Sequence, residues 1–180
     1  MMRRIFIAIN LPEDVKDQLV AYQKKIDGLF QPPVPIRWTH KDNLHITLEF
    51  LGNLSDDEVA KVCRDTEEFA KNHEPFTITL DKISYGPPYQ NKFGTGQAPK
   101  LPRMIWVIGE KVKELGLTPH VTLGRIKMWE FRQIEPEEKP NVSEAINLSF
   151  EVNSIEVMES RLKRAGLDYV VLEMCPLKEN

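Results

Sequence analysis

Cysteine is scarce in this sequence, and long apolar runs are missing from it. The 180 residues include two cysteines, Cys63 and Cys175, and neither belongs to a CxxC or zinc-ligand spacing. We therefore expect two separate, buried or half-buried thiols. No stretch approaches the roughly 20 apolar residues that a membrane span needs, and the opening MMRRIFIAINLPED lacks signal-peptide features. These absences predict a cytoplasmic protein that does not enter a membrane.

An excess of positive charge is also missing. The sequence has 24 Lys and Arg against 27 Asp and Glu, which gives a formal net charge of −3. This balance argues against a protein that coats nucleic acid by bulk positive charge, although it is compatible with a local basic site. The apolar fraction of 41% supplies enough material for a core, and the length suits one domain or two small lobes.

Apolar periodicity predicts an α+β fold with a mostly antiparallel sheet. Strands are expected at residues 3–10, 44–51, 76–83, 104–109, 120–127, 148–160 and 167–174. Helices are expected at residues 12–26, after a Ser55–Glu58 capping box, and over two short turns at 110–116. Residues 84–103 are rich in Gly and Pro and are expected to form a long loop.

Two of the four histidines lie in a repeated pattern, HITL from His45 and HVTL from His120. Residues two apart on a strand point to the same face, so Thr47 should lie beside His45 and Thr122 beside His120. The aliphatic residues between them then face a core. If the two strands face each other, two imidazoles and two hydroxyls meet in one cleft.

This set of groups suits the hydrolysis of a phosphodiester. One neutral imidazole takes a proton from water while a second, charged imidazole gives a proton to the leaving oxygen. Threonine hydroxyls can donate hydrogen bonds to the other phosphate oxygens. In-line displacement at phosphorus requires the attacking and leaving oxygens to be opposed, which a pair of facing histidines provides.

A structural role or a metal site could also account for these histidines. A single His on a strand is usually structural, but two copies in the same context are harder to explain in that way. A zinc site normally needs three protein ligands, and neither an HExxH nor an HxH pattern supplies a third one. His40 precedes a strand and His73 ends a helix, so we expect neither to be catalytic.

The motifs at residues 45–48 and 120–123 resemble those of the 2H phosphoesterase superfamily. Within it, the chain resembles the RNA 2′,3′-cyclic phosphodiesterases, also called 2′-5′ RNA ligases. The stretches RRIFIAINLPEDV, IRWTHKDNLHITLEFLGNLSDDEV and LTPHVTLGRIK are similar to the family's opening strand and helix and to its two motif regions. The resemblance implies one domain over residues 1–180. Its two pseudo-symmetric lobes of mostly antiparallel sheet, flanked by helices, would face each other across a central cleft.

The resemblance also implies a reaction that needs neither metal nor cofactor. The chain would open an RNA 2′,3′-cyclic phosphate to a 2′-phosphate, with His45 as proton donor to the 3′ oxygen and His120 as proton acceptor from water. Thr47 and Thr122 would hold phosphate oxygens. The reverse reaction would join RNA ends through a 2′-5′ linkage without ATP, because the cyclic phosphate is already activated.

Arg125 follows the second motif and has two interpretations. It could bind substrate phosphate, or it could be an ordinary charge on an edge strand. On a regular strand it would share the face of Val121 and Leu123, opposite His120, but Gly124 permits a bulge that would change this.

Two features depart from the family pattern. The family generally places a full helix before the second motif, where this chain has only residues 110–116, and the loop at 84–103 is long. The expected partner is an RNA end with a 2′,3′-cyclic phosphate. Open alternatives are a small cyclic nucleotide or ADP-ribose cyclic phosphate as substrate, or a non-catalytic module that binds RNA or nucleotides. We expect a monomer.

Overall fold

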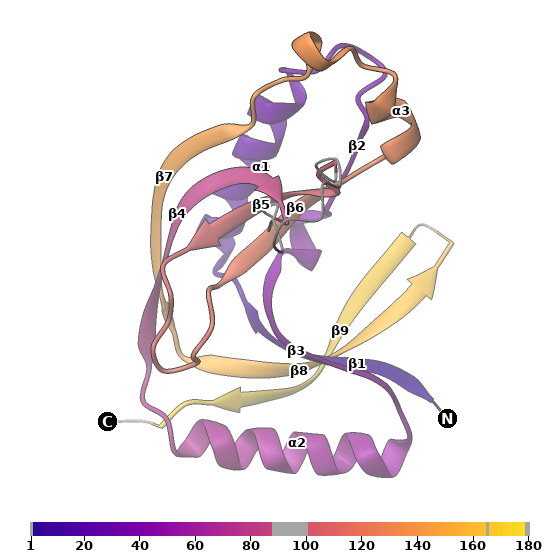
Figure 1. Cartoon of the computed structure of the whole chain (residues 1–180). Helices are drawn as coiled ribbons and strands as arrows, with labels where there is room; N and C mark the ends of the chain where they lie inside the picture. The colour runs from indigo at the N-terminus through magenta and orange to yellow at the C-terminus, as the bar shows by residue number, and fades with distance from the viewer. Residues whose placement is uncertain (1, 88–100, 165, 179–180) are drawn as a thin grey trace, which may run out of the picture.

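The computed structural model describes residues 2–87, 101–164 and 166–178 (Figure 1). The strands are β1 (Arg3–Asn10), β2 (Ile36–Trp38), β3 (His45–Leu54), β4 (Phe76–Gly86), β5 (Met104–Gly109), β6 (His120–Ile126), β7 (Ser143–Val152), β8 (Ser154–Lys163) and β9 (Gly166–Pro176). The helices are α1 (Glu13–Asp27), α2 (Asp56–Lys71) and α3 (Met128–Arg132), with 3-10 turns η1 (Lys41–Asn43) and η2 (Pro136–Glu138). The predicted α+β fold with mostly antiparallel sheet is confirmed.

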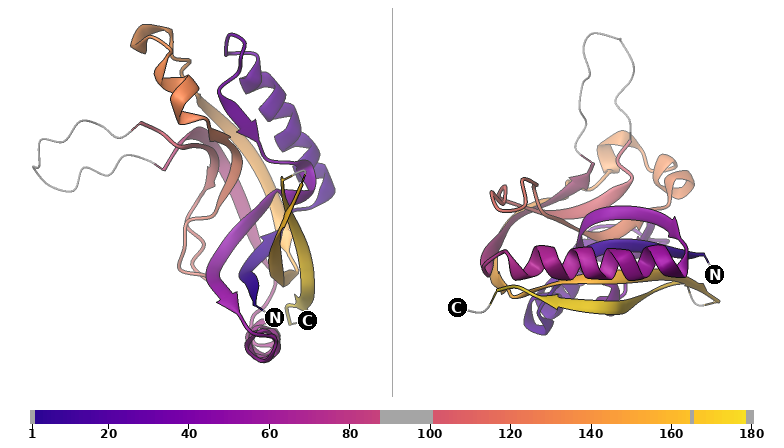
Figure 2. Two further views of the ribbon diagram at one scale, coloured as in Figure 1. Left: turned by 90° about the vertical axis from the view of Figure 1, so that its right-hand side faces the viewer. Right: turned by 90° about the horizontal axis from the view of Figure 1, so that it is seen from below.

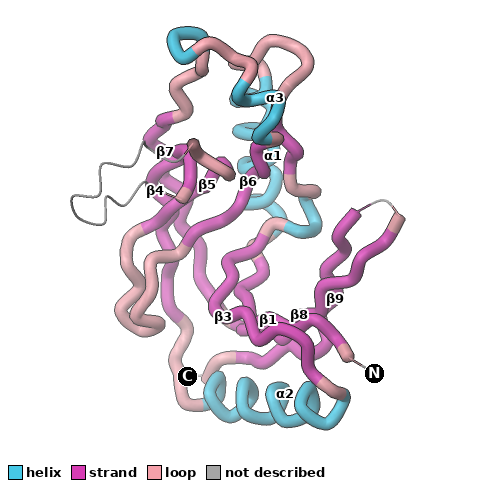
Figure 3. Tube along the Cα trace, turned by 45° about the vertical axis from the view of Figure 1, so that its right-hand side comes forward, coloured by secondary structure: helices cyan, strands magenta, loops and turns pink. Residues whose placement is uncertain are grey.

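The strands form one curled sheet whose two halves meet at the strands that carry the motifs. Its order is β7-β4-β5-β6-β3-β1-β8-β9, with β2 added beside β6, and the pairings are antiparallel. We call β3, β1, β8 and β9 the His45 half, and β6, β5, β4 and β7 the His120 half. They lie in the lower and upper parts of Figure 3. The register between the two halves is given by a single pair of residues, Ile46 and Val121.

One helix packs against each half of the sheet. The capping box predicted for α2 is present: Glu58 donates its backbone N–H to the Ser55 hydroxyl, and the Glu58 carboxylate accepts from the Ser55 N–H at 2.7 Å. Helix α2 lies against β8 and β9, at the bottom of Figure 1. Helix α1 packs against β6 and buries Leu19 and Ile26 in the main core, away from α2 (Figure 2).

The predicted helix at residues 110–116 is wrong. Residues 113–116 form a turn, closed by an antiparallel bridge between Val112 and Leu117. Gly116 has a φ of +64°, a left-handed conformation that ends any helical path and that glycine adopts without strain. The expected loop at 84–103 begins later, because β4 extends to Gly86, and its residues 88–100 lie outside the described residues.

The expected strand at 148–160 is two strands that belong to different halves of the sheet. The chain leaves β7 at Val152 and enters β8 at Ser154, so that β7 pairs with β4 while β8 pairs with β1 and β9. Asn153 alone separates them, with neither Gly nor Pro to mark the break. Both cysteines are free, with Cys63 half-buried and Cys175 buried, as predicted.

Candidate active site

His45 begins β3, and two hydrogen bonds fix its ring. Nδ1 lies 2.7 Å from the carbonyl oxygen of Asn43, which can only accept, so Nδ1 carries a proton. Nε2 lies 2.9 Å from the hydroxyl of Thr47. The next residue, Ile46, is fully buried in the main core and anchors the strand. The predicted alternation therefore holds, and Nε2 is the nitrogen of His45 that is free to exchange a proton.

Aromatic rings enclose the same imidazole. The ring centroids of Phe6 and Tyr169 each lie 5.1 Å from that of His45, and the Tyr169 ring stands at 90° to the imidazole. Burial lowers the pKa of His45 below its ordinary value, and the positive charge of Lys16 lowers this pKa further. His45 is therefore biased towards its neutral form in the free protein.

His120 begins β6 and has different surroundings. Its ring packs on the indole of Trp106 from the neighbouring strand β5, with centroids 4.3 Å apart. The hydroxyl of Thr122 is directed at the sulfur of Met104 at 3.9 Å, a weak partner that a phosphate oxygen can readily replace. The indole N–H of Trp106 donates to the same sulfur at 3.3 Å.

The two motifs meet in one small cavity of about 70 Å³. Because the strands are antiparallel around Ile46 and Val121, their register sets His45 beside Thr122 and Thr47 beside His120. The residues that line the cavity are Thr39, Asn43, His45, Thr47, Phe50, His120, Thr122, Arg125 and Tyr169. The predicted meeting of two imidazoles and two hydroxyls is therefore present in the fold.

A bulge in β6 brings Arg125 to this cavity. In the pairing of β6 with β5, Thr122 lies opposite Trp106 and Gly124 lies opposite Ile105. Leu123 therefore has no opposite residue on β5 and forms the bulge. Leu123 is buried while Arg125 is exposed and lines the histidine cavity. The placement expected for a regular strand is therefore wrong, and the bulge that Gly124 permits is present.

His40 and His73 lie outside the histidine cavity and have local structural contacts. The imidazole of His40 accepts a hydrogen bond from the backbone N–H of Asp42 at the start of η1. Near the end of α2, Nδ1 of His73 donates to the carbonyl of Phe69 at 2.7 Å, and the two rings stack 3.8 Å apart.

Three aromatic residues, Phe6, Trp106 and Tyr169, contact the histidines although the sequence does not predict them as part of the site. The sequence favours a core position for Trp106 and indicates only strand positions for Phe6 and Tyr169. Trp106 could have been found from its position on the strand that precedes the second motif, since an antiparallel neighbour of His120 must carry a side chain on the same face. Phe6 and Tyr169 have no such local signal, because their strands reach His45 only through the pairing of the sheet.

A larger cavity of about 560 Å³ adjoins the histidine cavity. The two share Thr39, Asn43, Arg125 and Tyr169. The other residues that line the larger one are Val20, Gln23, Arg37, Trp38, His40, Lys41, Gly166 and Leu167. A molecule whose reacting group sits between the histidines can therefore continue into this second space.

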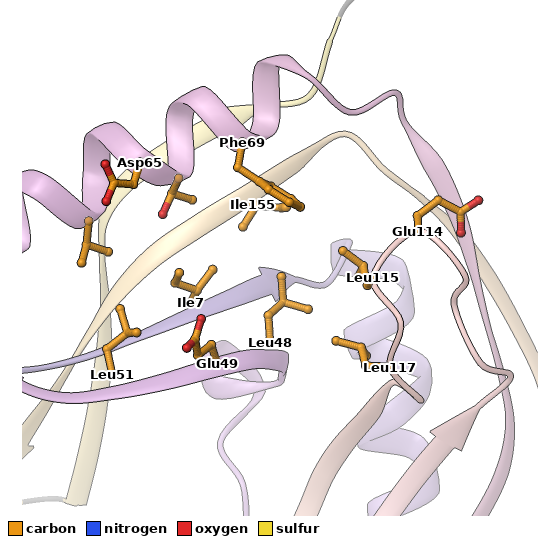
Figure 4. A pocket seen from close by; sticks show the side chains of 12 residues that line it. Ile7, Leu48, Glu49, Leu51, Asp65, Phe69, Glu114, Leu115, Leu117 and Ile155 are labelled. Carbon is orange, nitrogen blue, oxygen red and sulfur yellow. The ribbon is translucent and has the colours of Figure 1, made fainter.

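A third cavity, of about 470 Å³, opens on the opposite face of β3 (Figure 4). It lies between α2, β3 and the turn that follows β5, and Leu48, which alternates with Thr47, is part of its floor. Its lining is mostly apolar, with the carboxylates of Glu49, Asp65 and Glu114, and it contains no histidine. It is separate from the candidate active site.

The described residues hold neither a cluster of metal ligands nor a membrane-spanning helix. Among residues 2–87, 101–164 and 166–178, no group of three His, Cys, Asp or Glu side chains is placed to hold a metal ion together. Within that same part of the chain, no helix is long and apolar enough to cross a membrane.

Comparison with known proteins finds similarity to phosphoesterases. The model of the family described as LigT like Phosphoesterase matches residues 9–92, which include the first motif. An RNA 2′,3′-cyclic phosphodiesterase of Methanocaldococcus jannaschii is 25% identical over 191 residues, covering 94% of this chain and 98% of that relative. One of Thermus thermophilus is 28% identical over 192 residues, covering 97% of this chain and 90% of that relative.

Solved structures show the same fold. The structure of TT0787 of Thermus thermophilus has a TM-score of 0.74 and 24% identity, over 97% of this chain and 98% of that one. The apo form of E. coli LigT has a TM-score of 0.71 and 22% identity, over 99% of both chains. The chain is therefore similar to the LigT-like phosphoesterases in the region of its first motif, to RNA 2′,3′-cyclic phosphodiesterases in its sequence, and to the solved LigT structures in its fold.

Proposed function

We propose that this protein hydrolyses RNA ends that carry a 2′,3′-cyclic phosphate and leaves a 2′-phosphate. The observation that carries the proposal is the meeting of His45, Thr47, His120 and Thr122 around one small cavity. The names of the curated relatives, which are RNA 2′,3′-cyclic phosphodiesterases, support the choice of substrate.

In the proposed reaction, water attacks phosphorus while the bond from phosphorus to the 3′ oxygen breaks. His120 accepts the proton of the water, and His45 donates a proton from Nε2 to the leaving 3′ oxygen. After one turnover His120 is charged and His45 is neutral, so exchange with solvent restores the starting state. Each of these proton transfers contributes about 10²-fold to 10⁴-fold to the rate.

The two threonines suit the remaining phosphate oxygens. Thr122 has only a sulfur partner, so its hydroxyl can turn to an anion at little cost. Thr47 already meets Nε2 of His45, and a bound phosphate would lie between its hydroxyl and the imidazole. Arg125, at the edge of the cavity, adds positive charge close to the phosphate.

The lowered pKa of His45 is compatible with its role as a proton donor. In the free protein, burial favours the neutral imidazole. A bound cyclic phosphate places a negative charge beside the ring, and an opposite charge at this distance favours the protonated form. Binding of substrate therefore favours protonation of His45, which then has the proton that the leaving oxygen requires.

The same groups can open the cyclic phosphate with a different nucleophile. A 5′-hydroxyl in place of water would lose its proton to one imidazole and open the cyclic phosphate, which joins two RNA ends through a 2′-5′ linkage. The strained cyclic phosphate supplies the free energy, so this ligation needs no nucleotide cofactor.

The test is hydrolysis of a short oligonucleotide ending in a 2′,3′-cyclic phosphate, with wild type, His45→Ala and His120→Ala. We expect a 2′-phosphate product from wild type and a loss of at least about 10²-fold in each variant. His73→Ala is the matched control, because this imidazole hydrogen-bonds to and stacks on Phe69 of α2 and does not line the histidine cavity, and it should keep wild-type activity.

The result also separates the alternatives. Turnover of a mononucleotide or ADP-ribose cyclic phosphate, without turnover of the oligonucleotide, would replace RNA by a small substrate. Binding without turnover of any cyclic phosphate would identify a non-catalytic binding module. Full activity in His45→Ala or His120→Ala would contradict the proposed acid–base pair.

A further inference from the structure

Two arginines face each other next to the histidine cavity. In the antiparallel pair of β2 and β6, Arg37 is the direct partner of Arg125. Both side chains are exposed, and both line the larger cavity. Like charges directly opposite each other on neighbouring strands destabilise a sheet. In the part of the chain that the structure describes, neither guanidinium has a hydrogen bond or an ion pair to offset this.

The side chains of Lys41 and Gln23, which also line the larger cavity, already have partners. Lys41 forms ion pairs with Glu13 at 3.0 Å and with Asp17 at 2.6 Å. The side-chain amide of Gln23 donates to the backbone carbonyls of Thr39 and Leu123, at 2.8 and 2.9 Å. The two arginines are therefore the groups in this cavity whose charge is available to a ligand.

The side chain of Arg37 extends across the larger cavity. A Cβ atom at Gly166 would lie 2.8 Å from Nη2 of Arg37, so this guanidinium reaches across to the start of β9 and uses the space left by the missing side chain. Arg125 belongs to both cavities. A ligand leaving the histidines therefore passes Arg125 first and Arg37 next.

We propose that Arg37 and Arg125 form a second phosphate subsite, which binds the phosphodiester that precedes the cyclic phosphate in an RNA chain. The inference rests on the proposed function and deepens it. A guanidinium offers paired donors that match two phosphate oxygens, and two such groups can both donate to one phosphodiester. The histidine cavity holds the reacting phosphate, and the arginine pair selects a substrate with a second phosphate one nucleotide away.

The test compares three substrates that differ in this second phosphate. They are a nucleoside 2′,3′-cyclic phosphate, the same compound with a 5′-phosphate, and a dinucleotide ending in a 2′,3′-cyclic phosphate. Wild type should have a kcat/KM about tenfold to hundredfold higher on the dinucleotide than on the first compound. Arg37→Ala should lose most of this preference, and Arg37→Lys should keep part of it. Arg64→Ala, an exposed arginine of α2, is the matched control.

A second readout is salt dependence. Binding of a dinucleotide with a 2′-phosphate end should weaken with salt, and the slope of log K against log salt should fall by about 0.7 in Arg37→Ala. Circular dichroism of each variant checks that it is folded.

The outcomes distinguish the two proposals. If wild type turns over none of the three compounds, the proposed function fails. If wild type turns over all three equally, and Arg37→Ala changes neither the preference nor the salt slope, the arginine subsite is refuted while the proposed function stands. If the 5′-phosphate alone restores the full preference and the dinucleotide does not exceed it, the subsite binds a terminal phosphate, and the proposal of a chain phosphodiester is overturned.

Discussion

Replacing Gly124 by alanine should damage the junction that positions Arg125. A Cβ at this position would lie 2.7 Å from Cγ2 of Ile36 and 2.9 Å from Cε3 of Trp38, both on β2. Ordinary contacts between such carbons are about 3.5 to 4.0 Å, so β2 must move outward or both side chains must turn. Gly124 is not in the left-handed region, so this cost is steric.

The size of the effect follows from this overlap. Overpacking by one methyl group usually costs about 1–3 kcal/mol, which corresponds to a fall in Tm of about 2–12 °C for a chain of this length. Because β2 carries Arg37 and β6 carries His120, displacement of the two strands should also reduce kcat/KM on an RNA cyclic phosphate by about tenfold.

The assay is thermal unfolding followed by circular dichroism, together with hydrolysis kinetics at a temperature where Gly124→Ala is fully folded. Gly28→Ala is the control, because its φ of −66° suits alanine and the nearest atom to its Cβ would be 3.5 Å away. The control should be neutral or more stable by about 0.4–1 kcal/mol. A Gly124→Ala protein with unchanged Tm and unchanged kcat/KM would refute the reasoning.

The remaining predictions concern proton transfer, phosphate contact and folding. We expect a bell-shaped plot of kcat/KM against pH. The limb due to His45 should lie below about pH 6.5, because the pKa of His45 is lowered. A monotonic plot between about pH 5 and pH 9 would count against two titrating imidazoles. Thr122→Val should lower kcat/KM about tenfold to hundredfold by removing a donor to a charged group, with Thr79→Val on β4 as the unaffected comparison; equal activity would remove Thr122 from the site. Ser55→Ala should cost about 1 kcal/mol by removing a helix cap and should leave hydrolysis per folded molecule unchanged; an unchanged Tm would show that the cap contributes nothing.

Elements with strong local signals could be predicted from the sequence. Strand β1 and the capping box of α2 were found because apolar periodicity and the Ser-x-x-Glu spacing are local properties. The period of two on a strand placed Thr47 on the face of His45 and Thr122 on the face of His120. The sequence therefore identified the chemical groups of the site and the strands that carry them.

Features that depend on pairing between distant segments could not be predicted in this way. At Asn153 the apolar alternation shifts by one position, from Phe150 and Val152 to Ile155 and Val157, but this shift does not reveal that β7 and β8 pair with different halves of the sheet. Strand β2 has only three residues after a Pro-rich connector, and it exists because β6 offers it a partner. The bulge at Leu123 depends on the register with β5, which local sequence does not contain.

The contact of Tyr169 with His45 depends on the curvature of the sheet, which local sequence does not predict. Strand β9 lies three strands from β3 in the sheet order, which on a flat sheet would separate the two strands by about 14 Å. The ring centroids are nevertheless 5.1 Å apart, because the sheet curls. No pattern along the chain encodes this curl.

The order in which the strands are joined has a consequence for synthesis of the chain. In the His120 half, β4, β5 and β6 pair in sequence order, but β7 pairs with β4, so that Val152 lies opposite Phe76. In the His45 half, β1 pairs with the nearby β3 and with the distant β8, so that Arg4 lies opposite Ser160. Each half is therefore completed only after β7 or β8 has been synthesised, and such long-range closure makes for slow folding.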